Sequence, residues 1–273
     1  MVKKRRLSNI IEDHSTEMHD DSSSNISPPM IYSGNDLINA SFKGDHDTVK
    51  DLLEKEIDAN YRDAHNRTSL RVACECGFVE VIKILLAHGA NMQLPPCGHD
   101  YNTALGLACK YGHITTVEVL LNHGADINQT GGNNMSPLVI AMDNYHFPLI
   151  RYLLEHSADA NKVCGSNGRT PLMIAASDCK NLVLIELLMR YGADANTVDS
   201  DGWSALVYAT DYHRPKVVKL LLEYGADIYA EDGVTNTLFH RDLFFNNPEM
   251  MELGRQFIDI NKRGDGDSKP IVK

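Results

Sequence analysis

Residues 169–196 read RTPLMIAASDCKNLVLIELLMRYGADAN, and they contain both halves of a pattern that recurs along the chain. Thr170 is of a type favoured just before a helix, and Pro171 fits the first helical position. Two groups of apolar residues follow, and Gly192 stands where a second helix would end, because glycine readily takes the left-handed conformation found there. The stretch therefore predicts two short helices followed by a polar turn.

This pattern returns at a nearly constant step. The acidic residue or asparagine of the turn motif stands at positions 58, 91, 126, 159, 194, 227 and 259, which gives spacings of 33, 35, 33, 35, 33 and 32 residues. A Thr/Ser-x-Leu motif keeps the same step, and an alanine stands five positions after each of Thr68, Thr103, Ser136, Thr170 and Ser204. Registration over seven units indicates a repeat protein, in which each unit buries its apolar face against the next.

Taken together, the T-P-L-x-x-A and G-A-D-x-N motifs resemble those of the ankyrin repeat family. The resemblance implies an all-α fold, an α-solenoid of about seven stacked ankyrin-like helix-turn-helix repeats with hairpin fingers. It places a repeat domain at 33–263, with an N-terminal capping unit at 33–60, five internal repeats at 61–229 and a C-terminal capping unit at 230–263. The last unit departs most, since Asp242 replaces the alanine and Met250 to Leu253 make a poor second helix.

The two ends of the chain lack the repeat. Residues 1–32 contain few apolar side chains, so they cannot bury enough surface to offset the entropy of ordering. We expect a disordered N-terminal arm there and a flexible tail at 264–273. The arm carries a candidate nuclear-import cluster made of Lys3, Lys4, Arg5 and Arg6. Ser8 follows this cluster in the context of a basophilic kinase site, where phosphate would add negative charge.

Composition and charge favour a globular protein and disfavour nucleic-acid-binding, membrane-spanning and disulfide-rich proteins. The chain has 273 residues, of which 43% are hydrophobic and 23% charged, as is usual for a globular protein. Its net charge of −11 disfavours nucleic acid and anionic membranes as partners. No apolar run approaches the roughly 20 residues of a membrane span, so we expect no membrane insertion. Six cysteines in a chain of this length do not suggest a disulfide scaffold, which favours the reducing cytoplasm or nucleus. We expect the chain to be monomeric on its own.

The sequence lacks the common motifs for catalysis, cofactor binding and metal binding. The sequence has no Gly-rich phosphate loop, no G-x-S-x-G and no H-E-x-x-H. Cys74 and Cys109 share one repeat position beside the core alanine, which favours packing over metal binding. Recurring aspartates such as Asp194 are expected to accept hydrogen bonds from backbone N–H groups of the turn. We therefore expect no enzyme, no cofactor and no metal.

Variable positions between the fixed motif residues form the candidate binding site. The resemblance to ankyrin repeats implies a concave groove, lined by fingers and first helices, that binds other proteins. The candidates on the fingers are Arg67, Asn102, Met135, Arg169 and Trp203, and those on the first helices are Lys110, Tyr111, Asn144 and Tyr212. Trp, Tyr, Met and Arg are enriched at binding hot spots, so we expect Trp203 to be the anchor, with Arg169 and Tyr212 beside it. The alternative is that Trp203 only packs on a neighbouring finger.

The sequence thus predicts a scaffold or adaptor for protein–protein interaction. Two alternatives stay open: a regulatory or targeting subunit that acts through its basic arm, and a fragment of a larger enzyme. Four asparagines also resemble the hydroxylation pattern of some ankyrin proteins, although they equally follow the repeat consensus: Asn60, Asn128, Asn161 and Asn196.

Overall fold

The structure is a computed structural model of the chain. It describes residues 32–93, 103–132, 134–178, 182–227 and 248–263. The expected N-terminal arm with its basic cluster and Ser8, the candidate Asn102, the replaced alanine position Asp242 and the expected tail lie outside the described residues. The fold described below is that of the unit at residues 32–273.

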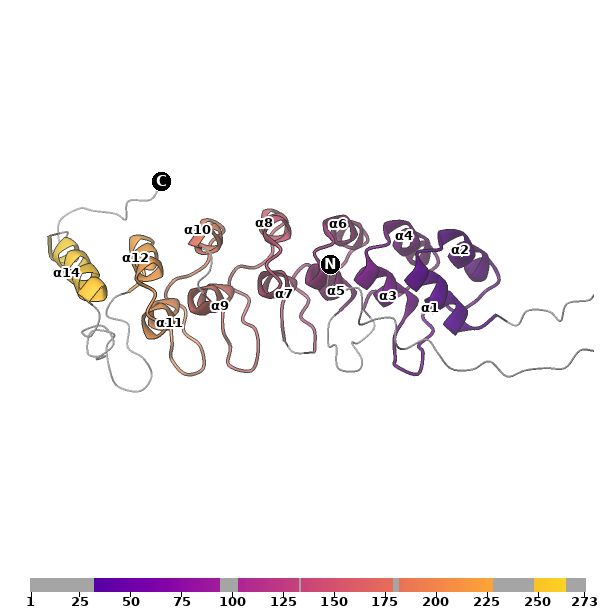
Figure 1. The fold of residues 1–273 in the computed structure, drawn as a ribbon, viewed down its shortest axis with the longest axis horizontal. Helices are drawn as coiled ribbons and strands as arrows, with labels where there is room; N and C mark the ends of the chain where they lie inside the picture. Colours follow the sequence, from indigo (N-terminus) through magenta and orange to yellow (C-terminus); the bar gives the residue numbers. More distant parts are fainter. Residues whose placement is uncertain (1–31, 94–102, 133, 179–181, 228–247, 264–273) are drawn as a thin grey trace, which may run out of the picture. The chain divides into compact units, whose positions relative to one another are not determined.

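In the described residues of this unit, the chain forms six helix pairs and one further helix (Figure 1). The first helices of the pairs are α1 (Gly34–Lys43), α3 (Ser69–Cys76), α5 (Ala104–Tyr111), α7 (Pro137–Asp143), α9 (Pro171–Asp178) and α11 (Ala205–Asp211). The second helices are α2 (His46–Glu54), α4 (Val79–Ala87), α6 (Ile114–Asn122), α8 (Phe147–Glu155), α10 (Leu182–Arg190) and α12 (Pro215–Glu223), and α14 (Pro248–Arg263) packs against α12. First helices contact first helices of the neighbouring pairs and second helices contact second helices, so the pairs form two rows. This arrangement confirms the predicted α-solenoid of ankyrin-like repeats.

Short fingers connect one pair to the next and extend from the first-helix row (Figure 1). Two of them are closed by an isolated antiparallel bridge, between Cys164 and Arg169 and between Val198 and Ser204. The described residues contain no helix that is both long and apolar enough to span a membrane.

Each internal first helix begins at the predicted hydroxyl cap. The side chain of Thr103 accepts a hydrogen bond from the N–H of Gly106 at 3.0 Å, which satisfies one of the open donors of the helix. The same bond recurs at Thr68, Ser136, Thr170 and Ser204. Pro137 and Pro171 occupy the first helical position, as their motif predicted.

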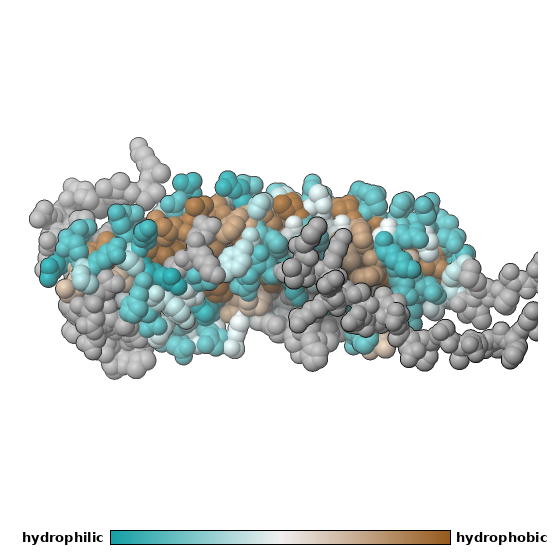
Figure 2. All heavy atoms as spheres, viewed as in Figure 1, coloured by the Kyte–Doolittle hydropathy of each residue, from teal (hydrophilic) through white to brown (hydrophobic). Residues whose placement is uncertain are grey.

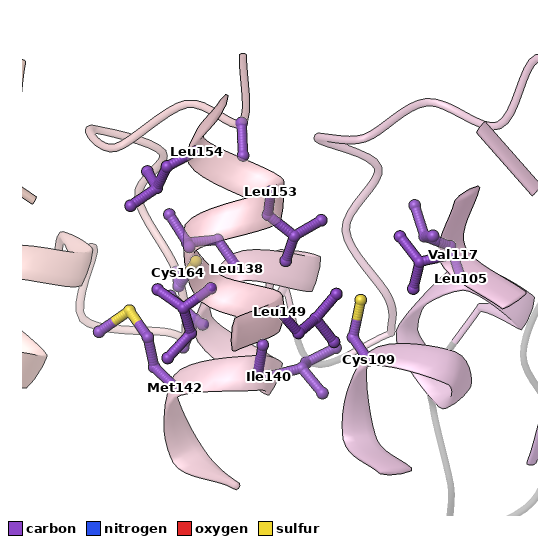
Figure 3. Close-up of a cluster of buried hydrophobic side chains, with 14 of the residues drawn as sticks. Leu105, Cys109, Val117, Leu138, Ile140, Met142, Leu149, Leu153, Leu154 and Cys164 are labelled. Atoms are coloured by element: carbon purple, nitrogen blue, oxygen red, sulfur yellow. The ribbon is translucent and has the colours of Figure 1, made fainter. Parts of the chain in front are cut away.

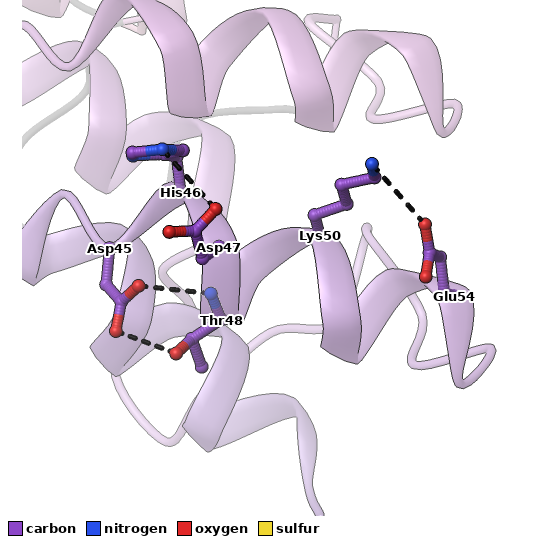
Figure 4. A network of polar contacts seen from close by, with 6 residues as sticks. All are labelled: Asp45, His46, Asp47, Thr48, Lys50 and Glu54. Atoms are coloured by element: carbon purple, nitrogen blue, oxygen red, sulfur yellow. Dashed lines mark hydrogen bonds and ion pairs between the residues drawn. The ribbon is translucent and has the colours of Figure 1, made fainter.

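The second helix of the first unit uses an acidic cap instead. Asp45 accepts hydrogen bonds from the hydroxyl of Thr48 at 2.7 Å and from its backbone N–H at 3.0 Å (Figure 4). These bonds hold the pKa of Asp45 below its usual range. One turn further, Lys50 and Glu54 form an exposed ion pair at 3.8 Å, of the kind that adds little stability. This face of α2 is therefore an ordinary solvent face.

A continuous apolar core runs between the two rows. Figure 3 shows part of it, where side chains of α5 and α6 meet those of α7 and α8: Leu105, Cys109, Val117, Leu138, Ile140, Leu149 and Leu153. Cys74 and Cys109 are fully buried, and burial raises the pKa of both thiols. Their predicted packing role is confirmed.

The last described helix is more regular than its sequence indicated. Met250 to Leu253, expected to make a poor second helix, lie in α14, a helix of 16 residues. Met250 is fully buried and Leu253 nearly so, and α14 packs against α12. Tertiary packing thus supports a helix whose repeat motif is weak. That this helix belongs to a C-terminal capping unit at 230–263 stays a prediction.

A ladder of asparagine side chains joins consecutive turns. Nδ2 of Asn161 donates to the carbonyl of Gly192 at 2.8 Å, and its Oδ1 accepts from the N–H of Asp194 at 2.8 Å. Asn60 and Asn196 make the same two bonds into the next unit, and Asn128 makes the second. Within each turn the aspartate takes its predicted role, as when Asp194 accepts from the N–H of Asn196 at 2.9 Å. That these asparagines are hydroxylated stays a prediction.

Two histidines make a second link between units. Nε2 of His113 donates to the carbonyl of Glu75 at 3.0 Å, and His146 does the same to Lys110 at 2.9 Å. The ring of His113 lies so close to Gly77 that an added Cβ would come within 2.8 Å of it. Gly77 also has a φ of +77°. Glycine is therefore favoured at this position because the backbone is left-handed and because the ring of His113 leaves no room for a Cβ atom.

The ladder yields a stability prediction. We expect Asn161→Ala to lower the free energy of unfolding by about 1–3 kcal/mol, because it removes two hydrogen bonds that join neighbouring units. Urea denaturation measures this loss. Asn122→Ala removes the same amide from the exposed end of α6 and should change stability by less than about 0.5 kcal/mol. Equal losses in the two variants would show that the ladder does not stabilise the stack.

Candidate functional site

The candidate site lies on the fingers and on the C-terminal ends of the first helices, together called the finger face below. Most of the predicted binding residues that the structure describes lie on this face and are partly or fully exposed. Tyr111 is 41% exposed and Tyr212 is 50% exposed, whereas Met135 is half-buried and packs against the core. The predicted residues thus differ in how much of each a partner could contact.

Several of these residues already have partners within the chain. Arg67 pairs with Asp63 in its own finger, Nε to Oδ2 at 2.7 Å. Tyr111 donates its hydroxyl to Glu75 at 2.8 Å. Lys110 lies 5.6 Å above the ring of Tyr111. Asn144 ends α7, and its amide donates to the carbonyl of Ile140 at 2.8 Å. The chain holds these side chains in defined orientations.

Trp203 belongs to an aromatic cluster that the sequence did not indicate in full. Its ring meets that of Tyr208 edge-on, with centroids 5.2 Å apart. The carboxylate of Asp199 joins the two residues, because it accepts from the backbone N–H of Trp203 at 2.9 Å and from the hydroxyl of Tyr208 at 2.6 Å. Trp203 itself is half-buried and packs partly on the core, so part of its surface stays accessible to a partner.

Arg169 completes this cluster from the preceding finger. Its guanidinium carbon lies 4.2 Å from the centroid of the Tyr208 ring, a cation–π arrangement. Nη2 donates to the hydroxyl of Ser177 at 2.7 Å and to the carbonyl of Met173 at 3.3 Å. We expected Arg169 beside Trp203, but the structure places Tyr208 in contact with both. The predicted proximity of Tyr212 to Trp203 stays a prediction.

Tyr208 and Asp199 are thus the site residues that sequence reasoning missed. An alignment of the repeats by their cap residues could have identified Tyr208. Tyr208 stands four residues after its cap, where the neighbouring first helices have Ile140 and Ile174. A tyrosine at an otherwise aliphatic core position needs a hydrogen-bond partner for its hydroxyl, and Asp199 in the same finger supplies one.

A second polar group lies on the neighbouring first helices. Tyr145 follows α7 in the left-handed conformation, with a φ of 58°, at a position where earlier units have glycine. Its hydroxyl donates to Asp178 at 2.7 Å, at the end of α9. Partial desolvation and the charge of Asp178 raise the pKa of Asp143, while Arg169 acts in the opposite direction. The charges of Asp143 in α7, Asp178 in α9 and Arg169 in the finger before α9 therefore influence one another.

The described residues hold no group of three or more His, Cys, Asp or Glu side chains that could bind a metal ion. Cys164, in the finger before α9, is buried, and its sulfur lies 3.5 Å from the hydroxyl of Ser136. Cys97 and Cys179 lie outside the described residues.

The bond between Tyr208 and Asp199 makes a pH-dependent prediction. Burial, followed by this hydrogen bond, raises the pKa of Tyr208 from 10.0 to about 12, so the folded chain keeps the proton at a pH where the unfolded chain loses it. The stabilisation is therefore complete below pH 10 and is lost as the pH rises toward 12. We expect Tyr208→Phe to cost about 1–3 kcal/mol at neutral pH, because Asp199 loses a donor, and the difference from the parent chain to shrink above pH 10.

Chemical denaturation of both chains over this pH range measures the difference. Tyr212→Phe serves as the control, since Tyr212 is half-exposed. A Tyr208 difference that stays constant as the solution becomes alkaline would contradict the assigned bond.

Comparison with known proteins places this geometry in context. The family model described as ankyrin repeats (3 copies) matches residues 37–131, 90–164 and 138–232. The crystal structure of the ankyrin repeat domain of Bcl-3, described as a unique member of the IkappaB protein family, superposes with a TM-score of 0.72. At 23% identity this match covers 81% of this chain and 97% of that one, and it shows a common fold.

A second protein is similar to this chain over a shorter segment. Serine/threonine-protein kinase 12 of Arabidopsis thaliana is 42% identical over 50 residues, which are 18% of this chain and 11% of the kinase. This chain therefore spans about a tenth of the length of that relative. The repeat motifs, the two rows of helices and the family match over most of the chain agree, and the chain belongs to the ankyrin repeat family.

Proposed function

We propose that this chain is a scaffold or adaptor that binds partner proteins on its finger face. Ankyrin repeats generally mediate protein–protein interaction and are not catalytic. The proposed binding domain is the stack at residues 33–263, monomeric on its own, in the cytoplasm or nucleus. The partner is another protein rather than a nucleic acid.

One observation carries the proposal. Residues from two consecutive fingers and the following first helix converge on a single cluster, in which Trp203 and Arg169 both contact Tyr208. Trp, Tyr and Arg are the residue types most enriched at binding hot spots. The cluster is already ordered before a partner arrives, so binding need not include the entropic cost of fixing these side chains.

The charge around this cluster supports the same proposal. The nearby carboxylates of Asp143 and Asp178 affect one another electrostatically, and Tyr145 holds Asp178 in place. A partner that brings donors to this part of the face would meet oriented acceptors. The electrostatic pattern would then add specificity to the contact area of the aromatic rings.

The two alternatives lead to different expectations. A targeting subunit that acts through its arm would lose its partner when residues 1–32 are deleted, whereas a partner held by the finger face would be retained. The alternative of an enzyme fragment is supported by the kinase match alone, and that match covers 50 residues, or 18% of the chain.

The central test is Trp203→Ala. Cross-linking of the full chain in lysate identifies the bound protein, and calorimetry then measures its affinity for the parent chain and the variant. We expect a loss of at least about 2 kcal/mol of binding free energy, because the largest aromatic ring of the cluster is removed. Since Trp203 is the single tryptophan, its emission should shift to the blue when the partner covers it.

Val163→Ala provides the matched control, because Val163 is 45% exposed and precedes the finger of Arg169. This variant should bind as the parent chain does. If Trp203→Ala binds unchanged, or if its emission in the free chain is already that of a buried ring and its folding stability collapses, Trp203 is a core residue and the proposed anchor is wrong.

A further inference from the structure

Helix α10 in the second-helix row has an unusual outer surface. Its first two residues, Leu182 and Val183, are 38% and 60% exposed. The equivalent position is polar in α4, α6 and α12, where Glu80, Thr115 and Lys216 occupy it, and is a proline, Pro148, in α8. A polar residue at this place suits a solvent face, so an exposed valine there requires another explanation.

Burial along the rest of α10 is also incomplete. Only Ile185 and Leu188 are fully buried, whereas Leu184, Leu187 and Met189 keep part of their surface exposed. Figure 2 shows hydrophobic side chains at the surface of the second-helix row, including the part of the stack where Figure 1 places α10. The apolar surface of α10 is therefore continuous over more than one turn.

Hollows border α10 on both sides. The one between α8 and α10 has a volume of about 350 Å³, and its lining includes Val183, Leu187 and Tyr191. The one between α10, α12 and α14 has a volume of about 400 Å³, and its lining includes Leu182, Pro215 and Val217. Each hollow is large enough to receive apolar side chains from a bound segment.

The lining of these hollows is basic although the chain as a whole carries a net charge of −11. Four cationic residues line them, against two acidic ones: Arg151, Arg190, Arg214 and Lys216, against Glu186 and Glu249. Nε of Arg214 is buried and has no hydrogen-bond partner in the described part of the chain. Carboxylates brought to these hollows could form charge-assisted hydrogen bonds with the lysine and arginine side chains that line them.

We propose that the outer surface of α10 is a second docking site, and that it binds an acidic amphipathic segment of a partner protein. Apolar side chains of the segment would cover Leu182 and Val183. Carboxylates beside them would face Arg214 and Lys216 in the hollow next to α12. This site lies in the second-helix row, so it does not depend on the finger face.

A designed peptide tests the proposal with the full chain. The probe is a short fluorescein-labelled helical peptide with leucines on one face and glutamates on either side of them. Its twin has lysine in place of every glutamate. Fluorescence anisotropy should show that the glutamate peptide binds at least about tenfold more tightly than the twin. Equal affinities, or no binding of the glutamate peptide, would overturn the proposal.

Two variants locate the bound peptide. Val183→Asp and Lys216→Glu change exposed side chains, and each should weaken the glutamate peptide about tenfold. Val163→Asp and Lys219→Glu make the same changes at exposed positions outside the hollows, and both should bind as the parent chain does. Helical circular dichroism and thermal melting confirm that all four variants are folded. Equal weakening by the control variants would indicate nonspecific attraction and overturn the proposal.

Two other occupants of this surface would give different experimental results. A dimer of the parent chain that Val183→Asp dissociates in analytical ultracentrifugation would show that a second copy covers α10. Tighter binding of the peptide after deletion of residues 1–32 would show that the chain's own N-terminal residues occupy the site. Either result would overturn the proposal of a partner segment.

Discussion

Close contact between neighbouring first helices is the constraint on which the rest of this structure depends. Ala73, Ala108, Ala141 and Ala209 are fully buried in that row. A methyl side chain lets two helices approach closely, so a larger residue at this position would push a unit away from its neighbour. No pair of helices has a closed core of its own, and each unit is therefore stable only as part of the stack.

The stacking also explains how much could be predicted from the sequence. Thr170, Pro171 and Gly192 indicated the helix ends correctly because caps and left-handed turns depend on local backbone chemistry. The turn aspartates followed for the same reason. The packing of Met250 against α12 and the contact of Arg169 with Tyr208 join different units, and a motif read one unit at a time does not contain such contacts. Sequence reasoning therefore named Trp203 and Arg169 but missed Tyr208, which contacts both.

The two rows of helices present surfaces of different chemistry. On the finger face, aromatic rings lie next to carboxylates that are held by hydrogen bonds, as with Tyr145 and Asp178. Around α10, exposed aliphatic side chains lie next to cationic ones such as Lys216. One regular scaffold can carry both surfaces because the residues that hold the units together occupy other positions. Substitution of the variable positions changes the surface and leaves the stack intact.

The asparagine ladder has a consequence for the evolution of the chain. Each rung joins only two consecutive units, as when Asn161 bonds Gly192 and Asp194. Duplication or deletion of one unit would break a single rung and allow an equivalent one to form with the next turn. The gene can therefore lengthen or shorten the protein by whole units without redesigning the junctions. The binding surface can grow by recombination, a route that is closed to a globular domain in which every element contacts one shared core.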